Sequence, residues 1–189
     1  MVYQEKEPEK WQSLAAPSVL METVVGRICS ERFRCLRTGA EGDFIFFDLK
    51  NWVVVLAETP DGKLLVVRQF RHGARTMQWE IPGGCIDAGE TDPAQAGIRE
   101  LLEETGYAGE DARVIGDICP NPALQSNRCY TVLVRNVRKV SAPALEDTED
   151  IETFAMTPGE ILGLIRRGEF EHGIMLDSIL FYLLEKEMI

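Results

Sequence analysis

The sequence predicts a mixed α/β (α+β) sandwich, and three observations indicate this fold class. Short apolar runs typical of strands recur along the 189 residues. Three stretches with helical spacing are interleaved with them, one central and two near the C-terminal end. The length of 189 residues allows one domain with a sizeable core but not two large domains, and the 45% of hydrophobic residues is ordinary for a globular protein.

The first part of the chain is predicted to form a small annex. Residues 1–15 have the composition of a loose tail. Residues 20–48 alternate short apolar and polar runs, which is typical of an antiparallel hairpin or small sheet. We therefore expect a tail and β annex at 1–48 and the main domain at 49–189.

Turn and cap signals divide the main domain into elements. Residues 52–71 predict two strands around the turn TPDG, because Pro pre-sets one backbone dihedral and Gly permits positive φ. A further strand is expected to end at the glycine pair 83–84. Asp92 as N-cap, Pro93 at the first helical position and Gly106 as terminator predict the central helix. The other expected elements are strands at 111–118, 128–137 and 150–156 and helices at 159–168 and 175–188, the first of these helices opened by a capping box.

The net charge and the cysteine content limit which partners and which location are expected. A formal charge of -11 argues against sequence-independent binding to nucleic acid, because phosphate backbones repel acidic surfaces. Five scattered cysteines are typical of reduced thiols. Because the chain also lacks a signal peptide pattern and an apolar run of the ~20 residues that a membrane span needs, we expect a cytoplasmic protein without a membrane partner. An anionic ligand would then need a divalent cation to hold it.

Three carboxylates share one face of the expected central helix. Glu100 and Glu104 are four residues apart and lie one above the other, with Glu103 beside them. Such a run is also typical of a solvated surface, but the stacked like charges favour a cation between them, and Mg²⁺ prefers oxygen ligands. Arg99 is expected to hold Glu103 by a salt bridge. The carbonyl of Gly83 can add a further oxygen ligand.

These residues resemble the signature of the Nudix hydrolases: a glycine, a glutamate, then Arg-Glu-apolar-x-Glu-Glu-x-Gly-apolar. The slots are filled by Gly84, Glu90, Arg99, Glu100, Leu101, Glu103, Glu104, Gly106 and Tyr107. Eight residues separate Glu90 from Arg99, where the family usually has seven. We expect the extra residue at Thr91-Asp92, before Pro93, which leaves the helical face intact and the position of Glu90 open.

The resemblance implies a Nudix-type α/β/α sandwich with a mixed central sheet. It also implies hydrolysis of a nucleoside diphosphate linked to another moiety, with Mg²⁺ or Mn²⁺. By position in the signature, Glu100 and Glu104 are the leading metal ligands. Glu103 is a further ligand or a catalytic residue, and the Gly83 carbonyl completes the set. Metal ions at such sites neutralise the diphosphate and lower the pKa of an attacking water.

The residues that precede the signature narrow the range of substrates that the resemblance implies. The run VVRQFRHGARTMQWEIPGG resembles the lead-in of ADP-ribose and sugar-nucleotide pyrophosphatases, and Pro122 matches a proline associated with the ADP-ribose group. The resemblance therefore implies a small-molecule nucleotide sugar, such as ADP-ribose or GDP-mannose, cleaved to a nucleoside monophosphate and a sugar phosphate. The annex resembles the region that these enzymes use to dimerise and to cover the base, which implies a homodimer.

The same resemblance implies substrate contacts for five side chains. Arg68 and Arg71 are candidates for phosphate or ribose, because a planar guanidinium suits that task. Glu80 is a candidate for the ligand or the metal shell, and Phe33 and Phe46 for the two sides of a purine. Each has an ordinary alternative, namely a surface strand end for the arginines, a plain strand position for the glutamate and core packing for the phenylalanines.

The resemblance also implies a general base in an acidic loop outside the signature. LEDTEDIETF supplies Glu146, Glu149 and Glu152, and Glu149 fits the related pattern best as the group that accepts a proton from the attacking water. A solvated acidic loop is the alternative. His72 and His172 have no Ser or Cys partner pattern and are expected at the surface or in the core.

Two other functions stay open at this stage. One is a Nudix pyrophosphatase for nucleoside triphosphates, dinucleoside polyphosphates or RNA 5′ ends; net charge argues against RNA and the lead-in against the others. The second is a non-catalytic, nucleotide-binding Nudix domain. Such a domain is expected to lack one or more of the carboxylates that are present here.

Overall fold

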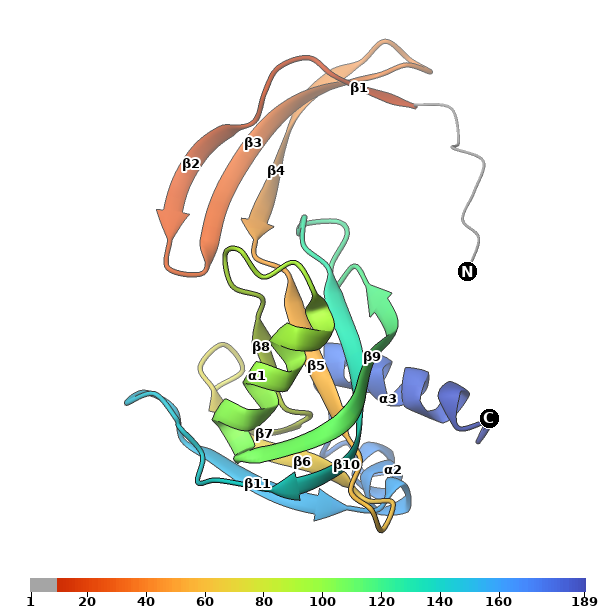
Figure 1. Ribbon diagram of the computed structural model, residues 1–189. Helices are drawn as coiled ribbons and strands as arrows, with labels where there is room; N and C mark the ends of the chain where they lie inside the picture. Colours follow the sequence, from red (N-terminus) through yellow and green to blue (C-terminus); the bar gives the residue numbers. More distant parts are fainter. Residues whose placement is uncertain (1–9) are drawn as a thin grey trace. The chain divides into compact units, whose positions relative to one another are not determined.

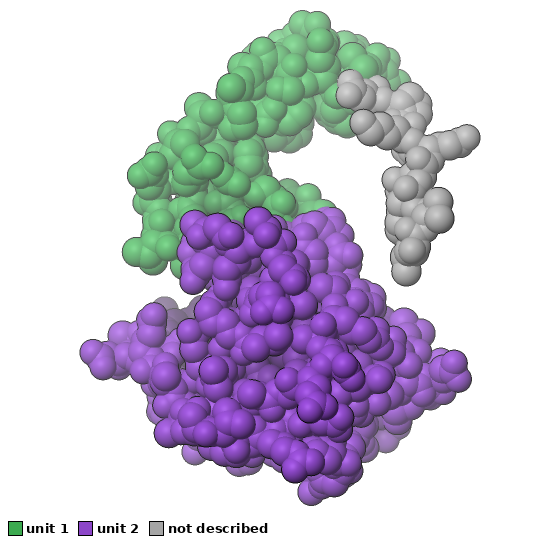
Figure 2. All heavy atoms as spheres, viewed as in Figure 1, with its two compact units in different colours: residues 1–49, 121–127 green, residues 50–120, 128–189 purple. Residues whose placement is uncertain are grey.

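The computed structural model describes residues 10–189 and divides them into two compact units (Figures 1 and 2). The first contains the chain up to Leu49 together with Asn121–Asn127, and the second contains residues 50–120 and 128–189. The segment Asn121–Asn127, which the sequence assigned to the main domain, thus clusters with the annex. The backbone N–H of Phe47 donates to the carbonyl of Leu124 over 2.7 Å.

The annex is an antiparallel sheet built around one long strand. Its strands are β1 (Trp11–Ser13), β2 (Ser18–Thr23), β3 (Gly26–Cys35) and β4 (Glu41–Leu49). β3 pairs with the other three, so the predicted small sheet is confirmed. The predicted loose tail is wrong for residues 11–13, because these pair in register with residues 33–35. Residues 1–9 of that tail lie outside the described residues.

The second unit contains two sheets. One has the order β8-β5-β10-β9 and is mixed, because β10 runs parallel to β5 while the other pairs are antiparallel. The other is antiparallel with the order β11-β6-β7. The strands are β5 (Trp52–Ala57), β6 (Leu64–Arg71), β7 (Thr76–Glu80), β8 (Gly83–Cys85), β9 (Tyr107–Ile118), β10 (Cys129–Lys139) and β11 (Ile151–Met156). The predicted mixed central sheet is confirmed.

Helices pack on both faces of the mixed sheet (Figure 1). They are α1 (Pro93–Thr105), α2 (Pro158–Arg166) and α3 (Gly173–Glu185). Successive strand residues point to opposite faces. Val53 and Val55 of β5 therefore pack with Leu101 of α1, whereas Val54 and Leu56 belong to a second core formed with α2 and α3. This arrangement is the predicted α/β/α sandwich. Within residues 10–189, every helix is too short or too polar to span a bilayer.

Local signals set most element ends, and the exceptions have local causes. The capping box is present, with mutual bonds between Thr157 and Glu160. The strand predicted at 111–118 begins earlier, at Tyr107, because the chain enters β9 directly after the helix cap. α3 begins at Gly173 and ends at Glu185, where the sequence predicted 175–188.

Candidate active site

The acidic helix α1 is held at both ends by the residues that the sequence indicated. The side chain of Asp92 accepts a 2.9 Å hydrogen bond from the Ala94 N–H. At the other end Gly106 has φ 70, a left-handed conformation that glycine adopts without steric cost, and its N–H donates to the carbonyl of Leu102. The helical face that carries the carboxylates is therefore intact, as predicted.

Glu104 and Glu100 contact the glycine pair that precedes the helix. Glu104 is buried, and its Oε2 accepts a 2.9 Å hydrogen bond from the Gly83 N–H. A Cβ on Gly84 would lie 2.6 Å from Oε1 of Glu100, so any other residue at this position would force the carboxylate to move. The predicted association of the glycines with the carboxylate face is thus a direct atomic contact.

Burial and like charge perturb both carboxyl groups. Burial raises the pKa of Glu104 to about 8; the hydrogen bond from Gly83 opposes this rise, and the negative charges of Glu100 and Glu149 add to it. Burial also raises the pKa of Glu100. Desolvation disfavours the charged form of a carboxyl group, whereas a nearby positive charge favours it. A cation beside Glu100 and Glu104 would therefore make both groups easier to ionise.

Arg99 binds the remaining carboxylates of the signature. Its Nε and Nη2 each donate to Glu90 over 2.9 Å, and Nη1 donates to Glu100 over 3.0 Å and to Glu103 over 2.9 Å. The predicted pairing of Arg99 with Glu103 is confirmed. Despite the extra residue, Glu90 keeps a two-bond contact with Arg99, which lowers the pKa of Glu90 to about 2.

The donor set on α1 suits a hard divalent cation. All candidate ligands are oxygens, and two of the carboxylates are desolvated beside each other. Within residues 10–189, no three Asp, Glu, His or Cys side chains are gathered as a ready metal-binding group. Glu100 and Glu103 both contact Arg99, and Glu104 contacts the Gly83 N–H. A bound cation would therefore replace Arg99 as the neighbour of at least one carboxylate.

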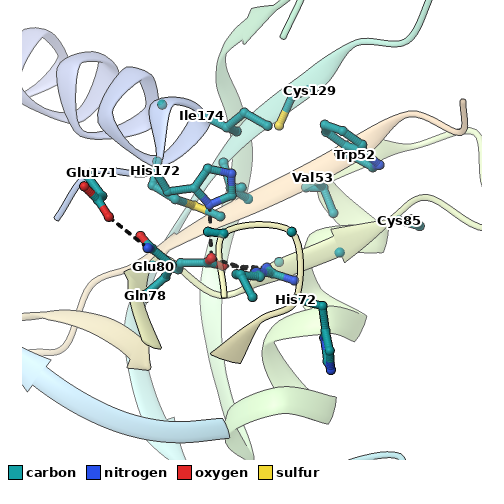
Figure 3. A pocket seen from close by; sticks show the side chains of 18 residues that line it. Trp52, Val53, His72, Gln78, Glu80, Cys85, Cys129, Glu171, His172 and Ile174 are labelled. Carbon is teal, nitrogen blue, oxygen red and sulfur yellow. Dashed lines mark hydrogen bonds and ion pairs between the residues drawn. The ribbon is translucent and has the colours of Figure 1, made fainter. Parts of the chain in front are cut away.

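A cavity of about 620 Å³ opens beside the glycine pair (Figure 3). Its apolar wall includes Trp52 of β5, Cys129 of β10 and Ile174 of α3. The register places Trp52 between Cys129 and Cys85 across the sheet. Its polar side carries Arg71, His72, Gln78, Glu80, Glu171 and His172. This combination of an aromatic and apolar wall with a few polar groups is typical of ligand pockets.

Arg71 and Glu80 form the central ion pair of the polar side. Nε of Arg71 donates to Glu80 over 2.7 Å and Nη2 over 2.5 Å, and Gln69 donates to the same carboxylate over 3.2 Å. Glu80 is wholly buried, whereas the Arg71 side chain is 42% exposed. Burial pushes the pKa of Glu80 upward, but the hydrogen bonds from Arg71 and the proximity of His172 outweigh it and hold that pKa below its usual range.

Arg68 lies on the opposite face of β6 from Arg71. In the β6–β7 register Arg68 is opposite Trp79, and its guanidinium carbon lies 5.2 Å from the centre of that indole. Gln69 and Arg71 share the other face with Glu80, because side chains alternate along a strand. The structure therefore brings Arg71, but not Arg68, to the cavity.

Phe33 and Phe46 share one face of the annex sheet without facing each other. Phe33 is opposite Gly42 and Phe46 is opposite Cys29, so they lie four residue steps, or about 13 Å, apart along the strands. Phe33 instead makes an edge contact with Phe44, with ring centres 5.9 Å apart. Within one chain these two rings do not enclose a single purine.

The three loop glutamates occupy different surroundings. Glu149 accepts a 3.0 Å hydrogen bond from the Glu146 N–H, and its charge raises the pKa values of both Glu104 and Arg71, which places it within electrostatic reach of the acidic helix and the cavity. Glu152 lies in β11 opposite Arg68, on the face turned away from Arg71. The charge of Glu149 thus acts on a residue of the acidic helix and on one of the cavity.

Sequence reasoning missed the contribution of the segment that precedes α3. His172 lies in the cavity wall, with Nδ1 3.1 Å from Oε1 of Glu80, and Glu171 accepts a 3.0 Å hydrogen bond from Gln78 (Figure 3). Gln78 and Glu171 are 93 residues apart in the chain. No local pattern marks such a contact. The expectation that His172 is an ordinary surface or core histidine overlooked its position at the cavity.

Comparisons with known proteins agree with the geometry of the site. A family model described as NUDIX domain matches residues 49–178. An ADP-ribose pyrophosphatase of Bacillus subtilis (strain 168) is 30% identical over 118 residues, 62% of this chain and 63% of the relative. One of Mycobacterium tuberculosis is 27% identical over 129 residues, 68% of this chain and 62% of the relative. An ADP-sugar pyrophosphatase of Mus musculus is 34% identical over 106 residues, 52% of this chain and 47% of the relative.

A solved structure shares the fold. The crystal structure of an ADP compounds hydrolase superposes with a TM-score of 0.80 and covers 98% of this chain and 100% of its own, at 16% sequence identity. The curated relatives are matched over less than two thirds of their own length. The family model, in contrast, spans more than half of this chain and includes α1, the glycine pair and the cavity strands. The chain belongs to the Nudix family.

Proposed function

We propose that this protein hydrolyses the diphosphate bond of nucleoside diphosphate sugars, ADP-ribose or GDP-mannose among them, to a nucleoside monophosphate and a sugar phosphate. The similarity to ADP-ribose and ADP-sugar pyrophosphatases supports the reaction class. The observation that carries the proposal is the meeting of Glu100 and Glu104 with the glycine pair 83–84 at the edge of a cavity that also holds Arg71.

The proposed cofactor is Mg²⁺ or Mn²⁺. Family membership supports dependence on a divalent metal in general, and the oxygen donors of α1 suit a hard ion. Glu100, Glu104, Glu103 and the carbonyl of Gly83 would hold it. Such an ion neutralises the charge of a diphosphate and lowers the pKa of an attacking water.

The protein's own groups would bind the substrate and move the proton. Arg71 offers a half-exposed guanidinium to a phosphate oxygen, and Glu80 orients that guanidinium. Glu149 accepts the proton of the attacking water, as a general base near the acidic helix can. Phe33 and Phe46 are proposed to contact the base singly, within a homodimer formed through the annex. Five free thiols support a cytoplasmic location.

A substrate panel tests the proposal. The purified protein is incubated with Mg²⁺ and ADP-ribose, GDP-mannose, ADP-glucose, UDP-glucose, a dinucleoside polyphosphate, a nucleoside triphosphate or an RNA 5′ triphosphate, and the products are separated by chromatography. Release of a nucleoside monophosphate and a sugar phosphate is expected, and the reaction run in ¹⁸O-water shows which phosphorus is attacked. Glu104→Gln is the matched control. Turnover of only triphosphates, polyphosphates or RNA would contradict the proposed substrate class, and no turnover would favour a non-catalytic binding domain.

A further inference from the structure

The buried carboxylate of Glu80 has three neighbouring donors that come from two parts of the chain. Arg71 and Gln69 of β6 hydrogen-bond to it, and His172 approaches it from the residue before α3. Glu80 itself has no exposed surface. A buried carboxylate without donors is costly, since removing one partner of a buried ion pair leaves an uncompensated charge and strongly destabilises a protein. If one of these donors moves away, another must therefore still donate a hydrogen bond to Glu80.

Arg71 is engaged with Glu80 in a way that competes with ligand binding. Two of its five N–H donors point at Glu80, and the carboxylate neutralises its charge. The same guanidinium is 42% exposed in the cavity, where the proposed diphosphate would need it. An anion that draws Arg71 toward itself therefore weakens the bonds that satisfy Glu80.

His172 is placed to compensate for that loss. Its Nδ1 lies 3.1 Å from Glu80 Oε1, but this buried nitrogen makes no aligned hydrogen bond. A small rotation of the ring would align it. A buried polar atom without a partner is destabilising, so its retention at this position calls for an explanation.

The segment that carries His172 is anchored on both sides. Phe170 is 1% exposed and Met175 is 4% exposed, and both belong to the core formed with α2 and α3. The hydrogen bond between Gln78 and Glu171 ties the segment to β7, the strand that also carries Glu80 (Figure 3). These contacts hold the backbone at His172 in place, and so keep the imidazole beside Glu80.

We propose that His172 is a positioning residue: its Nδ1 donates a hydrogen bond to Glu80 when Arg71 turns away to bind the diphosphate of the substrate. The inference rests on the proposed function, because it assumes that a diphosphate enters this cavity. It predicts that His172 influences substrate binding through Glu80, without contacting the reacting atoms.

Variants of His172 test the exchange. His172→Leu removes the donor, and we expect KM for the preferred nucleotide sugar to rise about tenfold with kcat changed less than about twofold, as loss of a hydrogen bond to a charged group predicts. His172→Gln can still donate and is expected to stay within about threefold of the wild-type KM. Glu169→Gln, in the same segment but paired with Arg167 at the surface, is the control and should change neither value.

A second measurement separates positioning from folding and from the proposed function. In the Glu80→Gln variant the buried side chain is a neutral amide and does not need His172 to stabilise a charge. Adding His172→Leu to this variant should therefore change KM less than about twofold. Binding of ADP, measured by calorimetry, should weaken about tenfold in His172→Leu at an unchanged thermal midpoint. Equal KM values for the Leu and Gln variants, or the same tenfold effect on the Glu80→Gln background, would overturn the inference. A wild type that binds ADP but cleaves none of the substrates would overturn the proposed function while the ADP affinities still decide the role of His172.

Discussion

The backbone N–H of Gly83 donates a 2.9 Å hydrogen bond to Oε2 of Glu104, twenty-one residues later in the chain. The bond joins the short strand β8 to the last turn of α1. It also places a buried carboxylate beside Glu100, which itself occupies the space that a side chain on Gly84 would need. The chemistry of the site therefore depends on contacts between the two glycines and the two glutamates, and each contact can be changed separately.

Gly84→Ala should disable the site through the position of Glu100. The added Cβ would lie 2.6 Å from Oε1 of Glu100, well inside van der Waals contact, so the carboxylate must move. We expect kcat/KM to fall at least about tenfold and the apparent Mg²⁺ affinity to weaken. Gly159→Ala is the matched control, because its nearest neighbour would be 3.9 Å away. Wild-type metal dependence in Gly84→Ala would contradict the assignment of Glu100 as a ligand.

Glu104→Gln should abolish turnover while keeping the fold. An amide has the shape of the protonated carboxyl group and can still accept the hydrogen bond from Gly83, but it is a poor ligand for a hard cation. We expect kcat to fall about a hundredfold or more, with an unchanged circular dichroism spectrum. Kinetics across a Mg²⁺ titration measure the loss. Full activity in this variant would exclude Glu104 as a metal ligand.

The stability of the metal-free protein should depend on pH through Glu104. Its pKa is raised from 4.5 to about 8 in the folded state, so the folded protein binds this proton more tightly than the unfolded chain does. The resulting stabilisation is complete below about pH 4.5 and is lost as the pH rises to about 8, with a total on the order of a few kcal/mol.

Thermal midpoints measured in chelator at pH 5.5, 6.5 and 8 check this dependence. We expect the wild type to lose stability across the series and Glu104→Gln to lose less of it. Added Mg²⁺ should stabilise the wild type most at the highest pH, because the ligand must give up its proton to bind the ion. Identical slopes for the two proteins would show that Glu104 is not the group responsible.

Replacing the two arginines of β6 by alanine should change kcat/KM to different extents. Arg71→Ala removes the cavity guanidinium and leaves buried Glu80 without two of its hydrogen bonds, so we expect kcat/KM to fall at least about a hundredfold and the thermal midpoint to drop. Arg68→Ala removes a contact with Trp79 on the other face of the strand and should change kcat/KM less than about threefold. Steady-state kinetics on both variants decide between them, and a reversed order would mean that the substrate uses the opposite face.

Glu149→Gln should lower kcat without affecting metal binding. The charge of Glu149 reaches Glu104 and Arg71, whereas Glu152 lies opposite Arg68, away from the cavity. We expect kcat to fall about a hundredfold in Glu149→Gln and to stay within about threefold in Glu152→Gln. A larger loss in Glu152→Gln would transfer the general-base role to that residue.

Much of the site was predictable because its signals are local. The cap by Asp92, the left-handed Gly106 and the four-residue spacing of Glu100 and Glu104 act within one helix, so periodicity and cap chemistry suffice to predict them. The pairing of Arg99 with Glu103 follows from the same geometry. These interactions need no knowledge of what packs against the helix.

The sequence by itself determined the acidic helix, its ends and the glycine pair before it. Only the tertiary structure decided what those residues face: that Arg71 and not Arg68 reaches the cavity, that Phe33 and Phe46 stand about 13 Å apart, and that His172 lies beside Glu80. Strand alternation predicts that Arg68 and Arg71 point to opposite faces, but not which face carries the ligand. Contacts such as that of His172 with Glu80 depend on how α3 packs against the sheets, a property of the whole core.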